Sequence, residues 1–341
     1  MRGNLLRSVE DVFETRETEK LEYGTQRKAS FLASRPKEYD AVIVGGGPAG
    51  LSAAAFCGKK RLRTAVFEGT CWGGILTRYC PDKRIDNYPG VPKGILAKEL
   101  AALLVEQAQK SGADLIEQGV EEITPDRTIR TKDLEVAGKV LILACGSNPA
   151  EAGIPGEREF ASGRGVHYRV YDPSRFRGLR VVVLGGGDTA ISHVQRLLGV
   201  AERVTLVHRK PLLRSAEGLS AEALRAENLK VLPGTVVEEI LGTSRVEGVR
   251  LRQGANGQTR DLPAEAVIIA AGRVPNSVLF RNLGLALDPK GQIVTEDWQK
   301  TNMPRILAIG DVTSRLKMII TAVAQAAVAA HEAHAQIYWK D

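Results

Sequence analysis

The sequence lacks most of the features that mark membrane, secreted and metal-binding proteins. Only four of its 341 residues are cysteines (Cys57, Cys71, Cys80 and Cys145), and none is followed three positions later by another. Because this leaves no CxxC pair and no ligand spacing for zinc, we expect no metal site and reduced thiols in the cytoplasm. No run of about 18 apolar residues occurs, so we expect no membrane span. Residues 1–38 lack an apolar core, which argues against a signal or transit peptide.

Aromatic residues are scarce too, at 5% of the chain, and they do not alternate with basic residues. This removes the stacking surface that single-stranded nucleic acid requires, so we expect no nucleic acid partner. The formal charge of +7 permits an acidic partner without requiring one. The basic residues that would steer such a partner, or equally form solvated loops, are Lys59, Lys60, Arg61, Arg63, Arg175, Arg177 and Arg180.

Glycine, in contrast, is abundant, with 35 residues that fall in clusters. Residues 41–50 read AVIVGGGPAG, an apolar run that ends in a G-x-G-x-x-G turn at Gly45, Gly47 and Gly50. A helical pattern follows, and then a second apolar run that ends at Glu68. This order predicts a strand–turn–helix–strand unit in which the glycines admit a pyrophosphate at the helix N-terminus. Glu68 is then placed to accept hydrogen bonds from a ribose diol.

The same unit recurs later in the chain. Residues 180–190 read RVVVLGGGDTA, with Gly185, Gly187 and Ala190 in the G-x-G-x-x-A variant. Glu68 lies 23 residues after Gly45, and His208 lies 23 residues after Gly185. The second copy therefore places cations where the first places a carboxylate, and cations favour the 2′-phosphate of NADP. The residues of this cationic segment are His208, Arg209, Lys210 and Arg214.

Two such units predict an α/β protein with two Rossmann-like dinucleotide-binding domains. The carboxylate of the first unit suits a dinucleotide with a free ribose diol, either FAD or NAD. The second unit suits NADP in preference to NAD. Two dinucleotide folds in one chain indicate electron transfer between two cofactors, because an enzyme that uses a nicotinamide alone needs only one.

From about residue 39 to residue 335 the chain resembles the low-molecular-weight thioredoxin reductase superfamily. The segment VFEGTCWGGILT is similar to the flavin-contacting GGQLT segment of that family, IDNYPG to its E-N-x-P-G turn, and LILACGSNP to its A-T-G stretch. HRKPLLR is similar to its phosphate clamp, and ILAIGDV to its A-x-G-D motif. The resemblance implies a three-layer ββα architecture, one FAD and one NADPH per subunit, and a homodimer.

The resemblance also implies domain boundaries and site residues. An N-terminal extension (1–38) precedes a FAD-binding domain in two parts (39–154 and 273–341) that flank an NADPH-binding domain (155–272), with hinges near 153–156 and 270–274. Cys80 stands where a branch of this superfamily, similar to this chain in segments given below, has a flavin-stacking tyrosine, and Tyr79 is an alternative for that role. Contacts with FAD are implied for Gly45, Gly47, Pro48, Ala49, Gly50, Glu68, Gly73, Gly74, Ile75, Leu76, Thr77, Cys80, Asn87, Val120, Cys145, Gly146, Gly310, Asp311, Lys317, Met318 and Ile319. Contacts with NADPH are implied for Gly185, Gly187, Asp188, Thr189, Ala190, His208, Arg209, Lys210 and Arg214.

The chain departs from thioredoxin reductases just before the second glycine turn. Those enzymes carry their redox CxxC there, whereas this chain has Arg169, Val170, Tyr171 and Asp172. Reduction of a disulfide needs two sulfurs at that place, so the sequence argues against the standard thioredoxin route. The segments PGEREFASGRGVHY and YCPDKRID resemble the thioredoxin-reductase-like ferredoxin/flavodoxin–NADP reductases instead. We therefore expect hydride transfer from NADPH to FAD and single electrons to ferredoxin or flavodoxin, with no catalytic acid–base pair.

Other interpretations stay open. A flavoprotein of the same fold without CxxC would serve another acceptor, such as a quinone, oxygen or a protein thiol through Cys80. A redox or nucleotide sensor without catalytic turnover is a third interpretation. In the N-terminal extension, apolar residues recur at helical spacing, which predicts an amphipathic stretch over about residues 4–20 that packs on the first domain or on a second subunit, or is a mobile arm. These residues are Leu5, Leu6, Val9, Val12 and Phe13.

Overall fold

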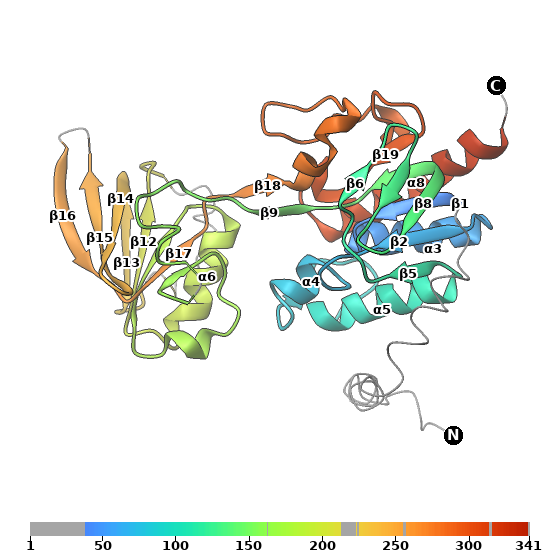
Figure 1. Ribbon diagram of the computed structural model, residues 1–341. Coiled ribbons are helices and arrows are strands. Elements are labelled where there is room, and N and C mark those ends of the chain that lie inside the picture. The colour runs from blue at the N-terminus through green and yellow to red at the C-terminus, as the bar shows by residue number, and fades with distance from the viewer. Residues whose placement is uncertain are drawn as a thin grey trace, which may run out of the picture. The chain divides into compact units, whose positions relative to one another are not determined.

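The structure is a computed structural model that describes residues 38–161, 163–212, 223, 225–254, 257–313 and 316–339. The amphipathic stretch and Arg214 lie outside these described residues. The chain divides into two compact units. The first ends at Ser147 and resumes at Pro275, and the second comprises Asn148–Val274 (Figure 1). The boundaries expected after residues 154 and 272 both fall inside the second unit.

The first unit is built on a mostly parallel seven-stranded sheet in the order β5-β2-β1-β8-β7-β6, with β19 also paired to β8. The nine-residue strand β8 pairs with β1 along one edge and with two strands along the other: residues 135–137 pair antiparallel with β7, and residues 141–143 pair parallel with β19. The strands are β1 (Glu38–Val44), β2 (Thr64–Phe67), β5 (Asp114–Ile116), β6 (Glu122–Ile123), β7 (Thr128–Arg130), β8 (Glu135–Leu143) and β19 (Ile306–Ala308), with a separate hairpin of β3 (Arg84–Ile85) and β4 (Ile95–Leu96).

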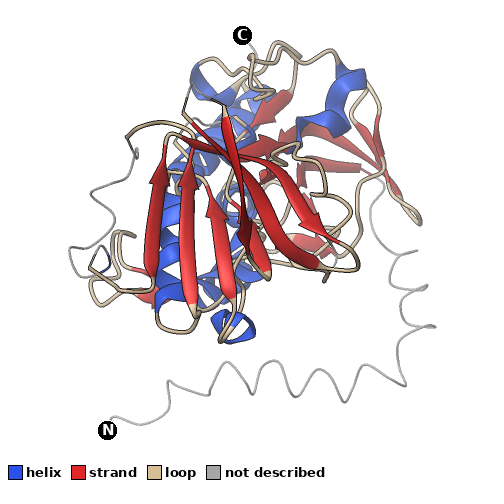
Figure 2. Ribbon diagram, turned by 90° about the vertical axis from the view of Figure 1, so that its left-hand side faces the viewer, coloured by secondary structure: helices blue, strands red, loops and turns tan. Residues whose placement is uncertain are grey.

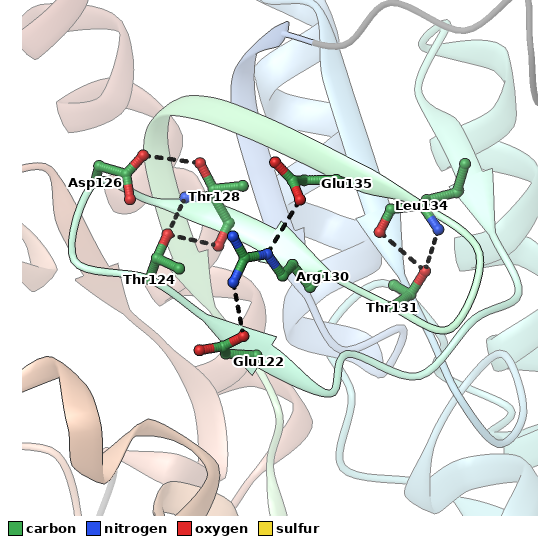
Figure 3. A network of polar contacts seen from close by, with 8 residues as sticks. All are labelled: Glu122, Thr124, Asp126, Thr128, Arg130, Thr131, Leu134 and Glu135. Atoms are coloured by element: carbon green, nitrogen blue, oxygen red, sulfur yellow. Dashed lines mark hydrogen bonds and ion pairs between the residues drawn. The ribbon is translucent and has the colours of Figure 1, made fainter.

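The antiparallel end of this sheet is tied together by polar side chains (Figure 3). Arg130 on β7 donates to Glu122 on β6 (Nη1–Oε2 3.0 Å) and to Glu135 on β8 (Nε–Oε2 3.1 Å). These hydrogen bonds raise the pKa of the guanidinium, but the group is exposed, so the ion pairs add little to stability. Their role is to fix which residues of the three strands face one another.

Alternation along β1 divides the core of the first unit between the two faces of the sheet. Ala41 and Ile43 join an apolar cluster with the helices, whereas Val42 and Val44 join the cluster on the opposite face. The helices on the first face are α3 (Pro48–Lys59), α5 (Ala97–Lys110) and α8 (Ile319–Tyr338), and shorter elements are α4 (Ile75–Arg78), η3 (Asn276–Leu283), η4 (Asp297–Gln299) and η5 (Gly310–Val312). Among the helices of the described residues, none has the length and hydropathy to cross a bilayer.

The second unit consists of a helix layer, a parallel sheet and an antiparallel sheet; its strands, drawn red, face the viewer in Figure 2. On β11, Val181 and Val183 pack with α6, and Val182 and Leu184 pack with β14 and β15. This is the predicted three-layer ββα arrangement. Its elements are β10 (Val166–His167), η1 (Pro173–Phe176), β11 (Arg180–Leu184), α6 (Asp188–Leu198), β12 (Arg203–His208), β13 (Leu229–Pro233), β14 (Thr235–Gly242), β15 (Val246–Gln253), β16 (Gln258–Pro263) and β17 (Ala266–Ile269).

The two chain crossings between the units run as a pair of short strands, β9 (Ser147–Pro149) and β18 (Arg273–Pro275). The segment 153–156, expected to be a hinge, is instead tied to the second unit by Glu157. The buried carboxylate of Glu157 accepts hydrogen bonds from the backbone N–H of Ala152 and Ile154 and from the hydroxyl of Tyr168, at 2.8–3.1 Å. The boundary between the units therefore lies earlier in the chain than residue 154. The sequence pattern did not reveal this, because the hydrogen bonds of Glu157 depend on the fold of the loop and not on a motif.

Candidate functional site

In the first unit, four strands end level with one another. Val44 of β1 is paired with Phe67 of β2 and Leu143 of β8, and Leu143 is paired with Ala308 of β19. The loops that follow these strands leave the same edge of the sheet, which is where open parallel sheets bind ligands. All four loops contain residues that the sequence assigned to FAD.

The glycine turn after β1 has no room for side chains at two of its glycines. Gly45 has φ +110°, and a Cβ there would overlap the carbonyl oxygen of Ala144. A Cβ on Gly50 would overlap the carbonyl oxygen of Gly45, so the first turn of α3 packs directly on the end of β1. Helix α3 begins at Pro48, and no side chain caps its N-terminus at Gly47. The first turn of α3 therefore presents its backbone N–H groups and the positive end of the helix to an anion such as a pyrophosphate.

Glu68, at the end of β2, is brought against the glycine turn. Its Oε2 accepts a hydrogen bond from the backbone N–H of Gly46 at 2.8 Å, and its Oε1 accepts from the N–H (2.8 Å) and the hydroxyl (2.6 Å) of Thr70. A direct contact thus joins Gly46 and Glu68, which are 22 positions apart in the sequence. A carboxylate held in this way is oriented before a ribose binds.

The predicted flavin segment touches the same turn. The N–H of Gly73 donates to the carbonyl of Gly46 at 2.8 Å, and a Cβ on Gly74 would lie 3.0 Å from the Cα of Gly47. Both Gly73 (φ +88°) and Gly74 (φ +55°) have left-handed backbone that favours glycine. Ile75 then opens the short helix α4, which the hydroxyl of Thr77 ties back to the carbonyl of Trp72 at 2.7 Å and in which Leu76 is buried.

Trp72 is a part of this site that the sequence did not single out. A Cβ on Gly46 would lie 2.5 Å from the indole ring of Trp72, so the ring covers one side of the glycine turn. Its Nε1 donates to Glu117 Oε1 at 3.0 Å. Nothing in the spacing of the motifs distinguishes this tryptophan, because its role depends on the fold of a loop rather than on a repeat.

The third and fourth loops are linked by polar contacts across long sequence separations. Ser147 donates to Asp311 (Oγ–Oδ2 3.1 Å), and Asn276 donates through Nδ2 to the carbonyl of Cys145 at 2.8 Å. Gly310 has φ +76°, its N–H donates to Gln325 Oε1 at 2.7 Å, and a Cβ there would lie 2.9 Å from that of Ala49 in α3. Ser147, Asn276 and Gln325 were missed by sequence reasoning because their partners are far away in the chain. Gly146 accepts from the N–H of Asn276 at 3.0 Å, and Lys317, Met318 and Ile319 are half-buried where α8 begins.

Three further candidate residues lie at the margins of the loops. Cys80 is half-buried just after α4, and its thiol donates to the carbonyl of Ile75 at 3.4 Å. Asn87 is exposed in the turn after β3, and Val120 packs partly buried against the core on the other face of the sheet. Tyr79, the alternative to Cys80 for stacking, has the guanidinium of Arg78 5.1 Å from its ring centre.

The thiols differ in their surroundings, and this gives a testable prediction. Burial raises the pKa of Cys57 from 9.0 to about 12, and it does the same for Cys145, whose sulfur points inward although the residue is half-buried. We expect a thiol reagent at pH 8 to label Cys71 and Cys80 in the native protein and Cys57 only after unfolding, as mass spectrometry of the labelled peptides would show. Because the fold holds the neutral thiols, their contribution to stability is complete below about pH 9 and declines as pH rises toward 12. Rapid native labelling of Cys57 would contradict this burial.

In the second unit the same edge arrangement recurs. Leu184 of β11 is paired with Val207 of β12 and Ile269 of β17. Gly185 has φ +140°, and a Cβ there would lie 2.6 Å from the carbonyl oxygen of Ala270 and 3.1 Å from the Cβ of Ala190. Helix α6 begins at Asp188 with Gly187 as its uncapped N-terminal residue, and a Cβ on Gly187 would meet nothing within 4 Å. Asp188 and Thr189 are exposed in the first turn, so this helix end is open to an incoming phosphate.

The three residues that follow the second repeat do not share one role. His208 is buried, and a Cβ on Gly186 would overlap its imidazole, so the ring supports the glycine turn from beneath. Its Nε2 lies 3.1 Å from the carbonyl oxygen of Leu212. Arg209 and Lys210 are exposed beside the turn and are the available cations of the described part of this segment. The sequence grouped His208 with these cations, whereas the structure places it as a positioning residue of the turn.

Each unit thus holds a glycine turn, an uncapped helix N-terminus and, 23 residues after the first glycine, either a carboxylate or cations. Gly47 and Gly187 leave open space at the helix N-termini, where a phosphate fits. A carboxylate such as Glu68 suits a free ribose diol, and a cation such as Arg209 suits a 2′-phosphate. These residues fit FAD in the first unit and NADPH in the second. The fold and the two sites define a flavoprotein oxidoreductase that uses a nicotinamide nucleotide.

The sequence profile of the pyridine nucleotide-disulphide oxidoreductase family matches residues 39–326, and the chain belongs to that family. A thioredoxin reductase of Listeria monocytogenes is 33% identical over 308 residues, which cover 89% of this chain and 95% of the relative, and one of Treponema pallidum is 35% identical over 305 residues (88% and 97%). The crystal structure of Lactococcus lactis thioredoxin reductase in its FR conformation superposes with a TM-score of 0.81 at 32% identity, covering 88% and 99% of the two chains. The bacillithiol disulfide reductase of Bacillus cereus shares the fold at 18% identity, with a TM-score of 0.76. The resemblance to the thioredoxin reductase superfamily is thus confirmed, and FAD and NADPH are its cofactors.

Proposed function

We propose that this flavoprotein takes electrons from NADPH and passes them singly to ferredoxin or flavodoxin. FAD supplies the chemistry that this task needs, because a bound flavin accepts a hydride and releases electrons one at a time. The chain's own residues bind and orient the two cofactors: the helix N-termini at Gly47 and Gly187 hold the phosphates, and Glu68 and Arg209 discriminate between the riboses. No side chain is required to move a proton in this reaction.

The observation that carries the proposal is the absence of cysteine from the second unit, since all four cysteines of the sequence precede Asn148. The resemblance places the redox pair of thioredoxin reductases at residues 169–172. In this chain that segment is a structural turn: Val170 is buried in the core, and Asp172 accepts a hydrogen bond from the N–H of Ser174 at 2.9 Å and caps η1. Arg196 donates to the carbonyl of Tyr171 at 3.0 Å. Without sulfur at this place, electrons have no dithiol through which to reach a disulfide substrate.

An acidic electron carrier would need a basic surface on this protein. The structure shows which of the basic residues expected to steer such a carrier are exposed. Arg180 is paired with Glu265 (Nε–Oε1 3.0 Å), and this hydrogen bond raises the pKa of the guanidinium, so Arg180 is not available to a partner. Lys59, Arg61, Arg175 and Arg177 stay exposed. These residues support electrostatic steering of ferredoxin or flavodoxin, which increases the rate of association. A homodimer remains part of the proposal through the family resemblance.

Thioredoxin is the second candidate acceptor, because the relatives at 33–35% identity are named thioredoxin reductases. This route would have to use the two thiols of the first unit, Cys71 and Cys80. Cys71 Sγ lies 3.5 Å from the hydroxyl of Thr77, and the Cys80 thiol donates to a backbone carbonyl. Both side chains are thiols that are not joined in a disulfide in the described residues.

Anaerobic NADPH oxidation by the FAD-loaded protein separates the two candidates. One assay contains ferredoxin with cytochrome c as the final acceptor, and the other contains thioredoxin with a disulfide. Turnover in the first assay alone would support the proposal. Turnover with thioredoxin would show that the missing cysteine pair does not prevent disulfide reduction, and NADPH that fails to bleach the flavin would leave the sensor interpretation.

Replacing Cys80 with serine tests whether a thiol carries electrons. We expect ferredoxin-dependent turnover to be unchanged in Cys80→Ser, because the substitution keeps the size and the donor to the carbonyl of Ile75 and removes only the sulfur. The measurement is the steady-state rate at saturating NADPH, and Cys71→Ser is measured in the same way because Cys71 is the other thiol of that route. A loss of turnover in either variant without loss of FAD would indicate a thiol relay.

A further inference from the structure

A cluster of aromatic and histidine side chains is exposed at the C-terminal end of α8. Its five members, here called the aromatic patch, are Trp298, His331, His334, Tyr338 and Trp339. Trp298 stacks on His331 with ring centres 5.5 Å apart, and His331 meets Trp339 edge to face at 5.4 Å. His334 contacts Tyr338 at 4.9 Å. The two tryptophans and the tyrosine are nevertheless 51–60% exposed, and a contiguous apolar surface of this kind marks an interaction site.

The aromatic patch is remote from the cofactor chemistry of the first unit. The FAD loops lie at the N-terminal end of α8, where Gly310 and Met318 are found, whereas the aromatic patch lies at the other end of this 20-residue helix. An α-helix of that length spans about 30 Å. The exposed rings therefore need an explanation other than contact with the flavin.

The start of the described chain lies on the side of the first unit that carries the aromatic patch. Glu38 opens β1 and is paired with Ala137 of β8, and two residues further along β8 the ammonium of Lys139 contacts Asp40 at 2.8 Å. The hydrogen bond with Asp40 raises the pKa of Lys139. Helix α8 packs on β8, and the end of α8 and β1 lie on the same side of the first unit (Figure 1). The chain that precedes Glu38 thus joins the first unit on the side at which α8 ends with Tyr338.

The preceding segment has the composition to cover such a surface. Its apolar residues Leu5, Leu6, Val9, Val12 and Phe13 fall on one face at helical spacing. The 24 residues between Phe13 and Glu38 reach up to about 80 Å when extended, so length does not limit where the apolar face docks. Residues 10–22 contain six acidic and two basic side chains, and the aromatic patch is flanked by Lys60, whose Nζ lies 3.3 Å from His331 Nδ1, and by the exposed Lys59 and Arg61.

We propose that residues 5–13 cover the aromatic patch of their own chain, with their apolar face on Trp298 and Trp339 and the acidic residues that follow beside Lys60. The attachment point on the same side of the first unit gives this docking a high effective concentration, which favours the same chain over a second copy. The N-terminal extension is then a built-in cover of an otherwise exposed surface and is not required for cofactor binding.

The test uses the full FAD-loaded chain and its tryptophan fluorescence, because two of its three tryptophans belong to the aromatic patch. The variant Val9→Asp with Phe13→Asp breaks the apolar face. Its matched control, Asn4→Asp with Thr18→Asp, adds the same two negative charges on the opposite face of the predicted helix. The readouts are the emission maximum and the quenching by acrylamide, repeated in a Trp298→Phe, Trp339→Phe background to isolate the contribution of Trp72.

We expect Val9→Asp with Phe13→Asp to shift the emission maximum to longer wavelength and to increase quenching by acrylamide. The control variant should behave as the native chain. In the Trp298→Phe, Trp339→Phe background, variant and native chain should show the same emission. Equal quenching of variant, control and native chain would overturn the proposal. Sedimentation velocity distinguishes the occupant: loss of a dimer in the first variant alone would show that the segment covers a second copy, which also overturns it. Flotation with anionic phospholipid vesicles that depends on Val9 and Phe13, without any change in quenching, would assign the apolar face to a membrane surface instead.

Discussion

Replacing Gly50 with alanine is expected to give a protein that purifies without FAD and unfolds at a markedly lower temperature. The added Cβ would overlap the carbonyl oxygen of Gly45, which is backbone and cannot rotate away. Relief requires α3 to move off the end of β1, where Leu51, Ala53 and Ala54 are part of the buried core. Overpacking against backbone of this kind costs about 3 kcal/mol or more, and loss of the bound cofactor removes further stabilisation.

Two other glycines supply the comparison for this experiment. Gly47→Ala places its Cβ in nearly open space, 4.0 Å from the Cα of Gly74, with an ordinary φ of −79°, so the turn should fold while the methyl group obstructs the pyrophosphate. Gly199→Ala, at the end of α6, meets nothing within 4 Å and should change neither property. The measurements are the flavin absorbance per chain and the midpoint of thermal unfolding with and without added FAD. Full flavin content in Gly50→Ala would show that the turn adapts and that the close packing of α3 on β1 is not needed.

The two cofactor units could be predicted from the sequence because each is a local pattern. Strand, glycine turn, helix and second strand follow one another within about 30 residues in each unit, and the matching positions of Glu68 and His208 make the repeat visible. The structure places all of these elements where the pattern predicted, and Glu68 contacts Gly46 directly. Such patterns survive in a single sequence because the backbone geometry of the turn admits few alternatives to glycine.

The parts that sequence reasoning missed depend on contacts between distant residues. Asn276 binds the backbone of Cys145 across 131 positions, and Ser147 binds Asp311 across 164. No local pattern marks either pair. The burial of His208 is a different case: an aromatic-sized ring fits beneath Gly186 because that glycine has no side chain, so the same residue that looks like a cation in a basic segment is a packing residue in the fold. Charge in the sequence therefore did not determine which of the three residues is exposed.

Because Arg209 and Lys210 are exposed and His208 is buried, we expect the two exposed cations to recognise the 2′-phosphate. Arg209→Ala combined with Lys210→Ala is expected to lower kcat/KM for NADPH by about 100-fold while leaving kcat/KM for NADH nearly unchanged. Each cation lost removes a charge-assisted hydrogen bond to the 2′-phosphate, worth about 1.5 kcal/mol or somewhat more, and about 1.4 kcal/mol corresponds to a tenfold change. NADH has no phosphate at that position, so it loses nothing.

The control is Arg203→Ala, an exposed residue at the opposite end of the same strand, β12, which should affect neither nucleotide. Stopped-flow bleaching of the flavin by each nucleotide measures the effect on hydride transfer without any electron acceptor, so the result does not depend on whether ferredoxin or thioredoxin is the partner. An equal loss with NADPH and NADH would mean that Arg209 and Lys210 shape the turn rather than recognise the phosphate. The preference for NADPH would then have to come from Arg214 or from a residue outside this cationic segment.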